Sequence, residues 1–133
     1  MIYLDSCAVA KLVLIEPESA ALAEYLDRTT GSLVSSELTE VELHRALIKN
    51  EAGQEAHHRA DDLLTDITML PLSPVIATAA RLPGKALRSL DALHLATAQR
   101  LRKALTGFIT YDKRLAEAVR AVNMPVNAPG QIL

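Results

Sequence analysis

Two aspartates stand where predicted strands end, and their types and spacing could do chemistry. Asp5 directly follows the apolar run at residues 2–4, and Asp112 follows the run at residues 108–110 after one tyrosine. If the strands are parallel, both side chains reach the same edge of the sheet, where α/β proteins bind ligands. Each aspartate also stands where a helix N-cap is expected, and a cap is the simpler interpretation for either one alone.

Asp91 is a third candidate carboxylate. It lies in the first turn of a helix expected over residues 90–105, where the helix dipole favours an anion. Its neighbours on that helix are small and apolar, so this face is expected to pack against the protein. The alternative is an aspartate that only stabilises the helix dipole and keeps a partly exposed carboxylate.

Two glutamates compete for a place in the same site. Glu42 and Glu40 both lie in a helix expected over residues 37–50. They differ by about 200° around the axis, at roughly 3.6 residues per turn, so only one can face the site. Both faces carry apolar residues, and an exposed Glu42 could instead pair with Arg45 or Lys49. The residues alone leave the choice open.

Carboxylates that converge on one edge of a sheet repel one another unless a cation lies among them. Oxygen ligands of this kind favour a hard divalent ion, Mg²⁺ with Mn²⁺ as a plausible substitute. Such an ion activates water for in-line attack on a phosphodiester and stabilises the departing oxygen. The set of carboxylates therefore predicts phosphodiester hydrolysis, although no single aspartate does.

Alternating strands and helices must position these residues. The apolar pattern predicts strands over residues 2–4, 32–35, 68–72, 107–110 and 125–126, and helices over residues 6–15, 17–27, 37–50, 54–66, 75–82, 90–105 and 113–122. Pro71 favours an edge position for the third strand. This order predicts an α/β fold, a three-layer α/β/α sandwich with a short, mostly parallel central sheet flanked by helices. The length suits a single domain, residues 1–133.

Composition limits the function classes further. The formal net charge of −2 gives no general attraction to nucleic acid, so RNA binding needs a local basic patch. The preferred patch for the RNA backbone is Arg81, Lys85 and Arg88, just before the Asp91 helix. A lone cysteine, Cys7, and no apolar stretch long enough for a membrane span indicate a cytoplasmic protein without membrane contact.

Four segments together resemble the PIN-domain nucleases, and among them the VapC toxins of VapBC toxin–antitoxin pairs. The segments are Ile2-Tyr3-Leu4-Asp5-Ser6, Thr39-Glu40-Val41-Glu42-Leu43, Ser89-Leu90-Asp91-Ala92-Leu93-His94-Leu95-Ala96-Thr97-Ala98 and Phe108-Ile109-Thr110-Tyr111-Asp112-Lys113-Arg114-Leu115. Each motif alone is weak, but their order and spacing over nearly the whole chain are specific. Residues 53–83 carry no motif of this family.

This resemblance implies roles for particular residues. Asp5, Glu42, Asp91 and Asp112 are implied as the catalytic carboxylates, and the three aspartates as metal ligands. Ser6 and Thr110 are implied as supporting polar groups. The implied activity is Mg²⁺-dependent cleavage of cellular RNA (tRNA, rRNA or mRNA) by a homodimer that a cognate antitoxin inhibits.

Several competing interpretations remain at the sequence level. A PIN-like nuclease of RNA maturation or turnover without an antitoxin would share the same residues. The presence of all four carboxylates argues against a PIN-like domain that only binds a partner. A receiver domain would need an acidic pair after the first strand, where Asp5 stands alone. Cys7 and His94 are more simply a small buried hydrophobe and a satisfied structural histidine than catalytic groups.

Overall fold

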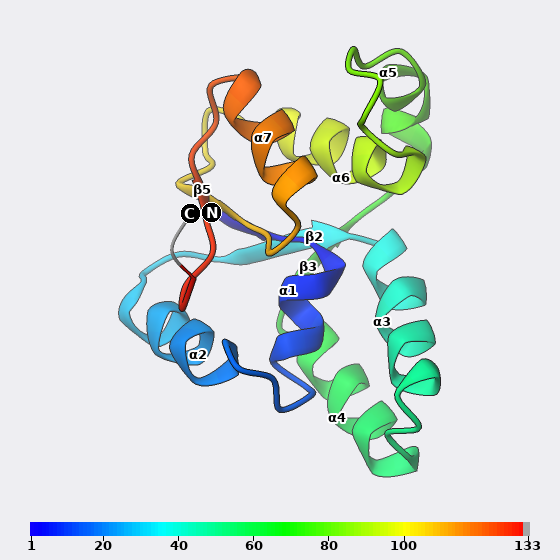
Figure 1. The fold of residues 1–133 in the computed structure, drawn as a ribbon, viewed down its shortest axis with the longest axis vertical. Helices are drawn as coiled ribbons and strands as arrows, with labels where there is room; N and C mark the ends of the chain where they lie inside the picture. The colour runs from blue at the N-terminus through cyan, green and yellow to red at the C-terminus, as the bar shows by residue number, and fades with distance from the viewer. Residues whose placement is uncertain (132–133) are drawn as a thin grey trace.

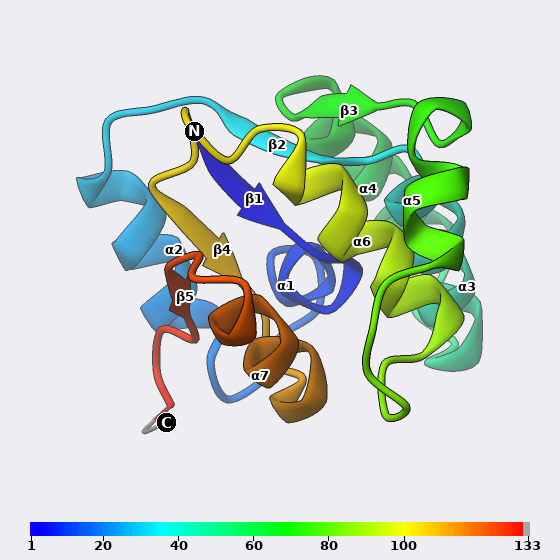
Figure 2. The ribbon, with the colours of Figure 1, turned by 90° about the horizontal axis from the view of Figure 1, so that it is seen from above.

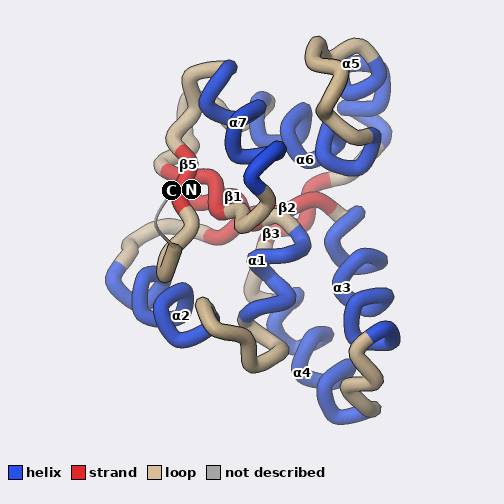
Figure 3. Tube along the Cα trace, in the orientation of Figure 1, coloured by secondary structure: helices blue, strands red, loops and turns tan. Residues whose placement is uncertain are grey.

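The computed structural model describes residues 1–131, which form a parallel sheet covered by helices on both faces (Figures 1 and 3). The strands are β1 (Ile2–Leu4), β2 (Leu33–Ser36), β3 (Thr68–Leu70), β4 (Gly107–Ile109) and β5 (Val126–Asn127). Their order in the sheet is β3-β2-β1-β4-β5, and all four neighbouring pairs are parallel. The expected three-layer α/β/α sandwich and the edge position of the strand before Pro71 are both confirmed.

The helices divide between the two faces of the sheet. α1 (Ser6–Lys11), α2 (Ser19–Arg28), α3 (Leu38–Lys49) and α4 (Gln54–Thr65) cover one face, and α5 (Ile76–Ala80), α6 (Ser89–Gln99) and α7 (Lys113–Ala121) cover the other (Figure 1). A short 3₁₀ turn, η1 (Ser73–Val75), leads into α5. On this face α6 contacts β2 and α7, and α7 contacts β5 (Figure 2).

β1 contributes to a separate apolar core on each face because successive side chains of a strand point to opposite sides. Ile2 and Leu4 pack with the cluster beneath α1 to α4. Tyr3 packs with the cluster beneath α6 and α7, where its ring stacks on Phe108 at a centroid distance of 4.8 Å. The phenol ring of Tyr3 thus lies on the side of the sheet that α6 covers.

The chain order creates a crevice between β1 and β4. From β1 the chain moves outward through β2 to β3 and then returns to the other side of β1 as β4. Leu4 pairs with Ile109, so the carboxyl ends of these two strands lie side by side. Ligands of parallel α/β sheets bind at such a change of direction.

Two expected helices end at least four residues earlier than the apolar pattern predicted. The helix expected over residues 6–15 ends at Lys11, and the one expected over residues 90–105 ends at Gln99. Beyond Gln99 the backbone continues in i→i+3 turns, for example from the Leu101 N–H to the Ala98 carbonyl. Because such turns have nearly the helical period, the apolar pattern continues past the true end of the helix.

The expected domain of residues 1–133 also includes residues 132 and 133, which lie outside the described part. No helix within residues 1–131 has the length and apolar character needed to cross a membrane.

Candidate active site

Asp5 is a buried carboxylate at the carboxyl end of β1, with only 3% of its surface exposed. It accepts hydrogen bonds from the Ala8 N–H at 3.0 Å, the Thr110 hydroxyl at 2.5 Å and the Cys7 thiol at 3.0 Å. The bond from Ala8 makes Asp5 the N-cap of α1. Burial raises the pKa of Asp5 despite these donors. The capping interpretation is therefore correct, but the side chain is far more buried than capping requires.

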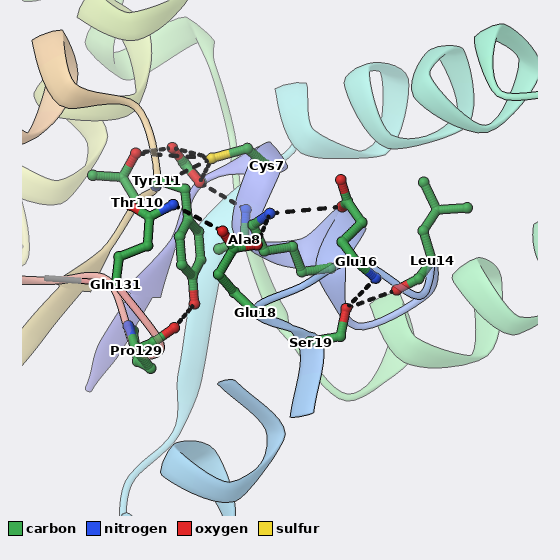
Figure 4. A network of polar contacts seen from close by, with 12 residues as sticks. Cys7, Ala8, Leu14, Glu16, Glu18, Ser19, Thr110, Tyr111, Pro129 and Gln131 are labelled. Atoms are coloured by element: carbon green, nitrogen blue, oxygen red, sulfur yellow. Dashed lines mark hydrogen bonds and ion pairs between the residues drawn. The ribbon is translucent and has the colours of Figure 1, made fainter. Parts of the chain in front are cut away.

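Thr110 connects Asp5 to Asp112. Its hydroxyl donates to Asp5 Oδ2 and accepts the Asp112 N–H at 3.1 Å. Asp112 Oδ1 accepts the Leu115 N–H at 3.0 Å, so Asp112 also caps its helix, α7. Figure 4 shows Thr110 and Cys7 close together at the start of the connection between β4 and α7. One buried hydroxyl thus holds the two strand-end aspartates in register.

Arg88 lies between Asp91 and Asp112. Its Nε donates to Asp91 Oδ2 at 3.2 Å and its Nη2 donates to Asp112 Oδ2 at 2.7 Å. The hydrogen bond to Asp91, followed by the charges of both aspartates, raises the pKa of Arg88. Asp91 and Asp112 therefore face one common position, and a cationic group occupies it.

Glu42 reaches the site from α3 and contacts α6. Its Oε1 lies 2.7 Å from His94 Nε2, and His94 Nδ1 lies 2.7 Å from the Tyr3 hydroxyl. Burial raises the pKa of Tyr3 well above its ordinary value, so the phenol stays protonated. Glu40 is exposed on another face of α3. Geometry thus brings Glu42, and not Glu40, to the site.

A cavity of about 460 Å³ opens beside Glu42 and Asp112. Three acidic residues line it, Glu16, Glu42 and Asp112, together with Ser6, Lys11 and Tyr111. The Lys11 ammonium lies 4.7 Å from the centre of the Tyr111 ring and binds Glu18 at 2.8 Å, which lowers the pKa of Glu18 to about 2. Figure 4 shows this network beside the Tyr111 ring.

The basic residues expected to bind RNA divide into two groups. Arg88 lies at the carboxylates, as described above. Arg81 and Lys85 are exposed in and near the segment between α5 and α6, and Arg81 donates to the Ala77 carbonyl of its own helix at 3.4 Å. The structure brings one member of the expected patch into the site.

The carboxylates at the site determine which ion it could hold. Within residues 1–131, no group of three or more histidine, cysteine, aspartate or glutamate side chains converges as a ready metal site. Mg²⁺ retains several waters and usually takes only one or two protein carboxylates. Asp91 and Asp112 both bind the Arg88 guanidinium, so two carboxylates converge on one position. Their hard oxygen atoms fit Mg²⁺ there.

The sequence predicts structural roles for Cys7 and His94. The Cys7 thiol donates to Asp5, and its pKa is raised, first by burial and then by the charge of Asp5, so it stays protonated and is not an activated nucleophile. His94 is buried as expected, but it contacts Glu42 directly. Its position one turn after Asp91 was the only sequence signal for this contact.

A fold of this kind, with carboxylates at the crevice beside its central strand, has close counterparts. The PIN domain family model matches residues 2–121. Ribonuclease VapC35 of Mycobacterium tuberculosis is 47% identical over 98% of this chain and 98% of its own length.

Solved structures agree on the fold. The crystal structure of Mycobacterium tuberculosis VapC20, described as a Sarcin-Ricin loop cleaving toxin, has a TM-score of 0.76 at 14% identity and covers 97% of this chain and 100% of that one. A toxin–antitoxin complex from Klebsiella pneumoniae has a TM-score of 0.73 at 20% identity and covers 99% of this chain and 100% of that one. The chain belongs to the PIN-domain family and, within it, to the VapC proteins.

Proposed function

We propose that this protein is a Mg²⁺-dependent endoribonuclease, the toxin of a type II toxin–antitoxin pair, which cleaves cellular tRNA, rRNA or mRNA and thereby arrests growth. Ribonuclease activity is in the name of VapC35, a relative at 47% identity, and toxin function is in the descriptions of the structures with the same fold. The proposal extends both to this chain.

The observation that supports it most is the sharing of one cationic group by Asp91 and Asp112. The two carboxylates approach the Arg88 guanidinium at 3.2 and 2.7 Å from different elements. Buried Asp5 is coupled to Asp112 through Thr110, and Glu42 lines the same cavity as Asp112. Acidic groups gathered in this way favour a bound cation.

The roles of the residues follow from their positions. Asp91 and Asp112 would hold the ion, with Mn²⁺ as a substitute, and Asp5, the third ligand that the family resemblance implies, is coupled to Asp112 through Thr110. Bound there, the ion would supply an activated water and neutralise charge that develops on the phosphate. Glu42 would orient or deprotonate groups in the cavity, and Ser6 and Thr110 would support the carboxylates.

RNA would approach over the exposed basic groups. The Arg88 side chain is 62% exposed while it still reaches Asp91 and Asp112, so it can also bind a backbone phosphate. Arg81 and Lys85 would extend this contact along the RNA backbone. Phosphate contacts position the RNA without reading its sequence, and they need only local positive charge.

Three further features complete the proposal. A cognate antitoxin would inhibit the enzyme by laying a segment over the cavity; one structure with this fold is described as a toxin–antitoxin complex. The protein would act as a homodimer. Because an RNA substrate and a protein antitoxin both occur in the cytoplasm, we place its action there.

The biochemical test is cleavage of a synthetic RNA hairpin with an unpaired loop. We expect cutting with Mg²⁺ or Mn²⁺, none after EDTA, and only a small residual rate from Glu42→Gln. Glu40→Gln is the matched control on the same helix and should cut at the wild-type rate. Undiminished cutting in EDTA would refute the metal-dependent mechanism, and loss in Glu40→Gln alone would show that the other face of α3 serves the site.

The cellular test is growth on induced expression. We expect arrest by the wild type, none by Asp5→Asn, and relief when the neighbouring antitoxin gene is co-expressed. If the protein cuts RNA in vitro but its expression is harmless, the toxin assignment fails, and a nuclease of RNA maturation or turnover replaces it.

A further inference from the structure

A buried polar chain crosses from the core on one face of the sheet to the candidate active site. It runs from the Tyr3 hydroxyl through the His94 ring to Glu42, with both contacts at 2.7 Å. Tyr3 is 0% exposed and His94 is 2% exposed. The three residues come from β1, α6 and α3, so the chain connects helices that cover opposite faces of the sheet (Figure 1).

The hydrogen atoms of this chain can be assigned from chemistry. An ionised carboxylate only accepts hydrogen bonds, so His94 Nε2 carries a hydrogen and donates it to Glu42 Oε1. In the neutral ring Nδ1 is then an acceptor, and the protonated Tyr3 hydroxyl donates to it. Tyr3 therefore selects the tautomer of His94 that has a donor to offer Glu42.

The surroundings indicate which of the three hydrogen-bonded residues holds the others in place. Tyr3 and His94 are fixed: their rings pack edge to face with centroids 5.9 Å apart, and Tyr3 stacks on Phe108. Glu42, in contrast, has a side chain 22% exposed on the cavity wall and three rotatable bonds. The more exposed partner is the one at the site, so we expect the buried pair to restrain it.

We propose that His94 is a positioning residue for Glu42 and that Tyr3 is the residue that sets the tautomer of His94. The ring takes Oε1 and so leaves Oε2 for a ligand in the cavity. Catalytic groups must be held within about 0.5 Å of their working geometry by such supporting contacts. This inference rests on the proposed nuclease function and names residues that the function itself does not require.

A purely structural role is the competing explanation, because a buried histidine needs partners wherever it occurs. Within residues 1–131 no buried side-chain nitrogen or oxygen lacks a hydrogen-bond partner, so satisfaction alone does not distinguish the two. The test therefore needs a variant that keeps the donor and a control that loses packing elsewhere.

Three variants separate these roles in cleavage of the RNA hairpin. His94→Leu keeps the volume and removes the donor, and we expect kcat to fall about 10–100-fold, as for other supporting contacts, with KM nearly unchanged. His94→Gln, whose amide can donate to Glu42, should recover most of the loss. Val119→Ala lowers stability in the core beneath α6 and α7 without contacting a carboxylate, and it should keep the wild-type kcat.

A double variant tests whether His94 acts through Glu42. His94→Leu should slow Glu42→Ala no further, because the group that His94 positions is already absent. If the double variant is slower than Glu42→Ala, or if Val119→Ala loses as much activity as His94→Leu, the positioning role is overturned.

The ¹⁵N chemical shifts of the His94 ring give a readout independent of RNA. We expect the Nε2–H tautomer in the wild type and a mixture of tautomers in Tyr3→Phe. A protein that cuts no RNA but shows these shifts would refute the nuclease proposal and keep the Tyr3–His94 contact. An Nδ1–H tautomer in the wild type would overturn the inference directly.

Discussion

Asp5 serves two structural purposes with one carboxylate. It caps α1 through the Ala8 N–H, and it binds the Thr110 hydroxyl inside the protein. An asparagine has the same shape and caps helices equally well. A change to asparagine therefore separates the charge of Asp5 from its role in the fold.

For Asp5→Asn we expect RNA cleavage to fall about 100-fold or more, as when a charge-stabilising group is removed from an active site. The fold should persist because the cap is retained. Cleavage rates and circular dichroism of the two proteins check this. An active Asp5→Asn enzyme would mean that Asp5 is only a cap.

The pH dependence of stability follows from the raised pKa of Asp5. Its ordinary value is 3.8, and the folded protein holds the proton more tightly than the unfolded chain does. The stability that Asp5 contributes is complete below about pH 3.8 and is lost as pH rises through the folded value. In EDTA, Asp5→Asn should therefore melt above the wild type at neutral pH, and the gap should close on acidification. A gain of about 1 kcal/mol would raise Tm by roughly 3–6 °C in a domain of this size.

Arg88 competes with a metal ion for Asp91 and Asp112. In Arg88→Gln both carboxylates lose their guanidinium partner, so we expect Mn²⁺ to bind roughly 2–10-fold more tightly, in line with the modest strength of exposed ion pairs. The KM for RNA should rise, and its salt dependence should weaken as one phosphate contact is lost. Calorimetry with Mn²⁺ alone and cleavage at several salt concentrations measure the two effects. Lys85→Gln should change only the KM for RNA and its salt dependence, and it should leave Mn²⁺ binding unchanged.

At the scale of elements, the connection between β4 and α7 does most to assemble the site. It carries Thr110, which binds both strand-end aspartates, and Tyr111, whose hydroxyl donates to the Pro129 carbonyl at 2.8 Å. Figure 4 shows Tyr111 extending from Thr110 toward Pro129. The position of Asp112 thus depends on neighbours from three parts of the chain.

Thr110→Val tests this connection. Valine has the same shape but leaves Asp5 and the Asp112 N–H without their buried partner, which costs about 1–3 kcal/mol. We expect a corresponding loss in urea unfolding and slower RNA cleavage. Thr110→Ser keeps the hydroxyl and should restore most of both. Equal losses in the two variants would assign the effect to packing instead of hydrogen bonding.

The sequence indicates the elements better than it indicates their ends or contacts. Strands and helices alternate visibly, and every expected strand exists, because apolar periodicity reports which face is buried. The two helices that proved shorter end in turns of nearly helical period, which periodicity does not detect. Aspartates after strands could be predicted from local order. The contact between Glu42 and His94 could not, since it joins residues 52 positions apart across two layers.

At the scale of the whole molecule, an apolar cleft between α5 and α6 is a candidate for the surface of the proposed homodimer. Ile76, 55% exposed, lies on its rim, and Leu82, Leu87 and Leu93 are in its lining. Symmetric dimers commonly form through a single self-complementary apolar patch of this kind.

Ile76→Glu should therefore convert a dimer to a monomer, because a charge on the rim would have to lose its water on association. Light scattering coupled to gel filtration measures the mass of both proteins. Thermal stability should change little, since the side chain is exposed in the single chain. A dimer that persists in Ile76→Glu would place the contact elsewhere on the surface.

The central place of β1 has a consequence for how the protein is made. β1 is the first strand to leave the ribosome, yet its neighbour β4 begins at Gly107, and Asp5 meets Thr110 from 105 positions away. Every nascent chain shorter than this lacks the Thr110 partner of Asp5. The proposed toxic function therefore requires synthesis at least as far as Thr110, and we expect polypeptides that stall or are cut before this point to be inactive.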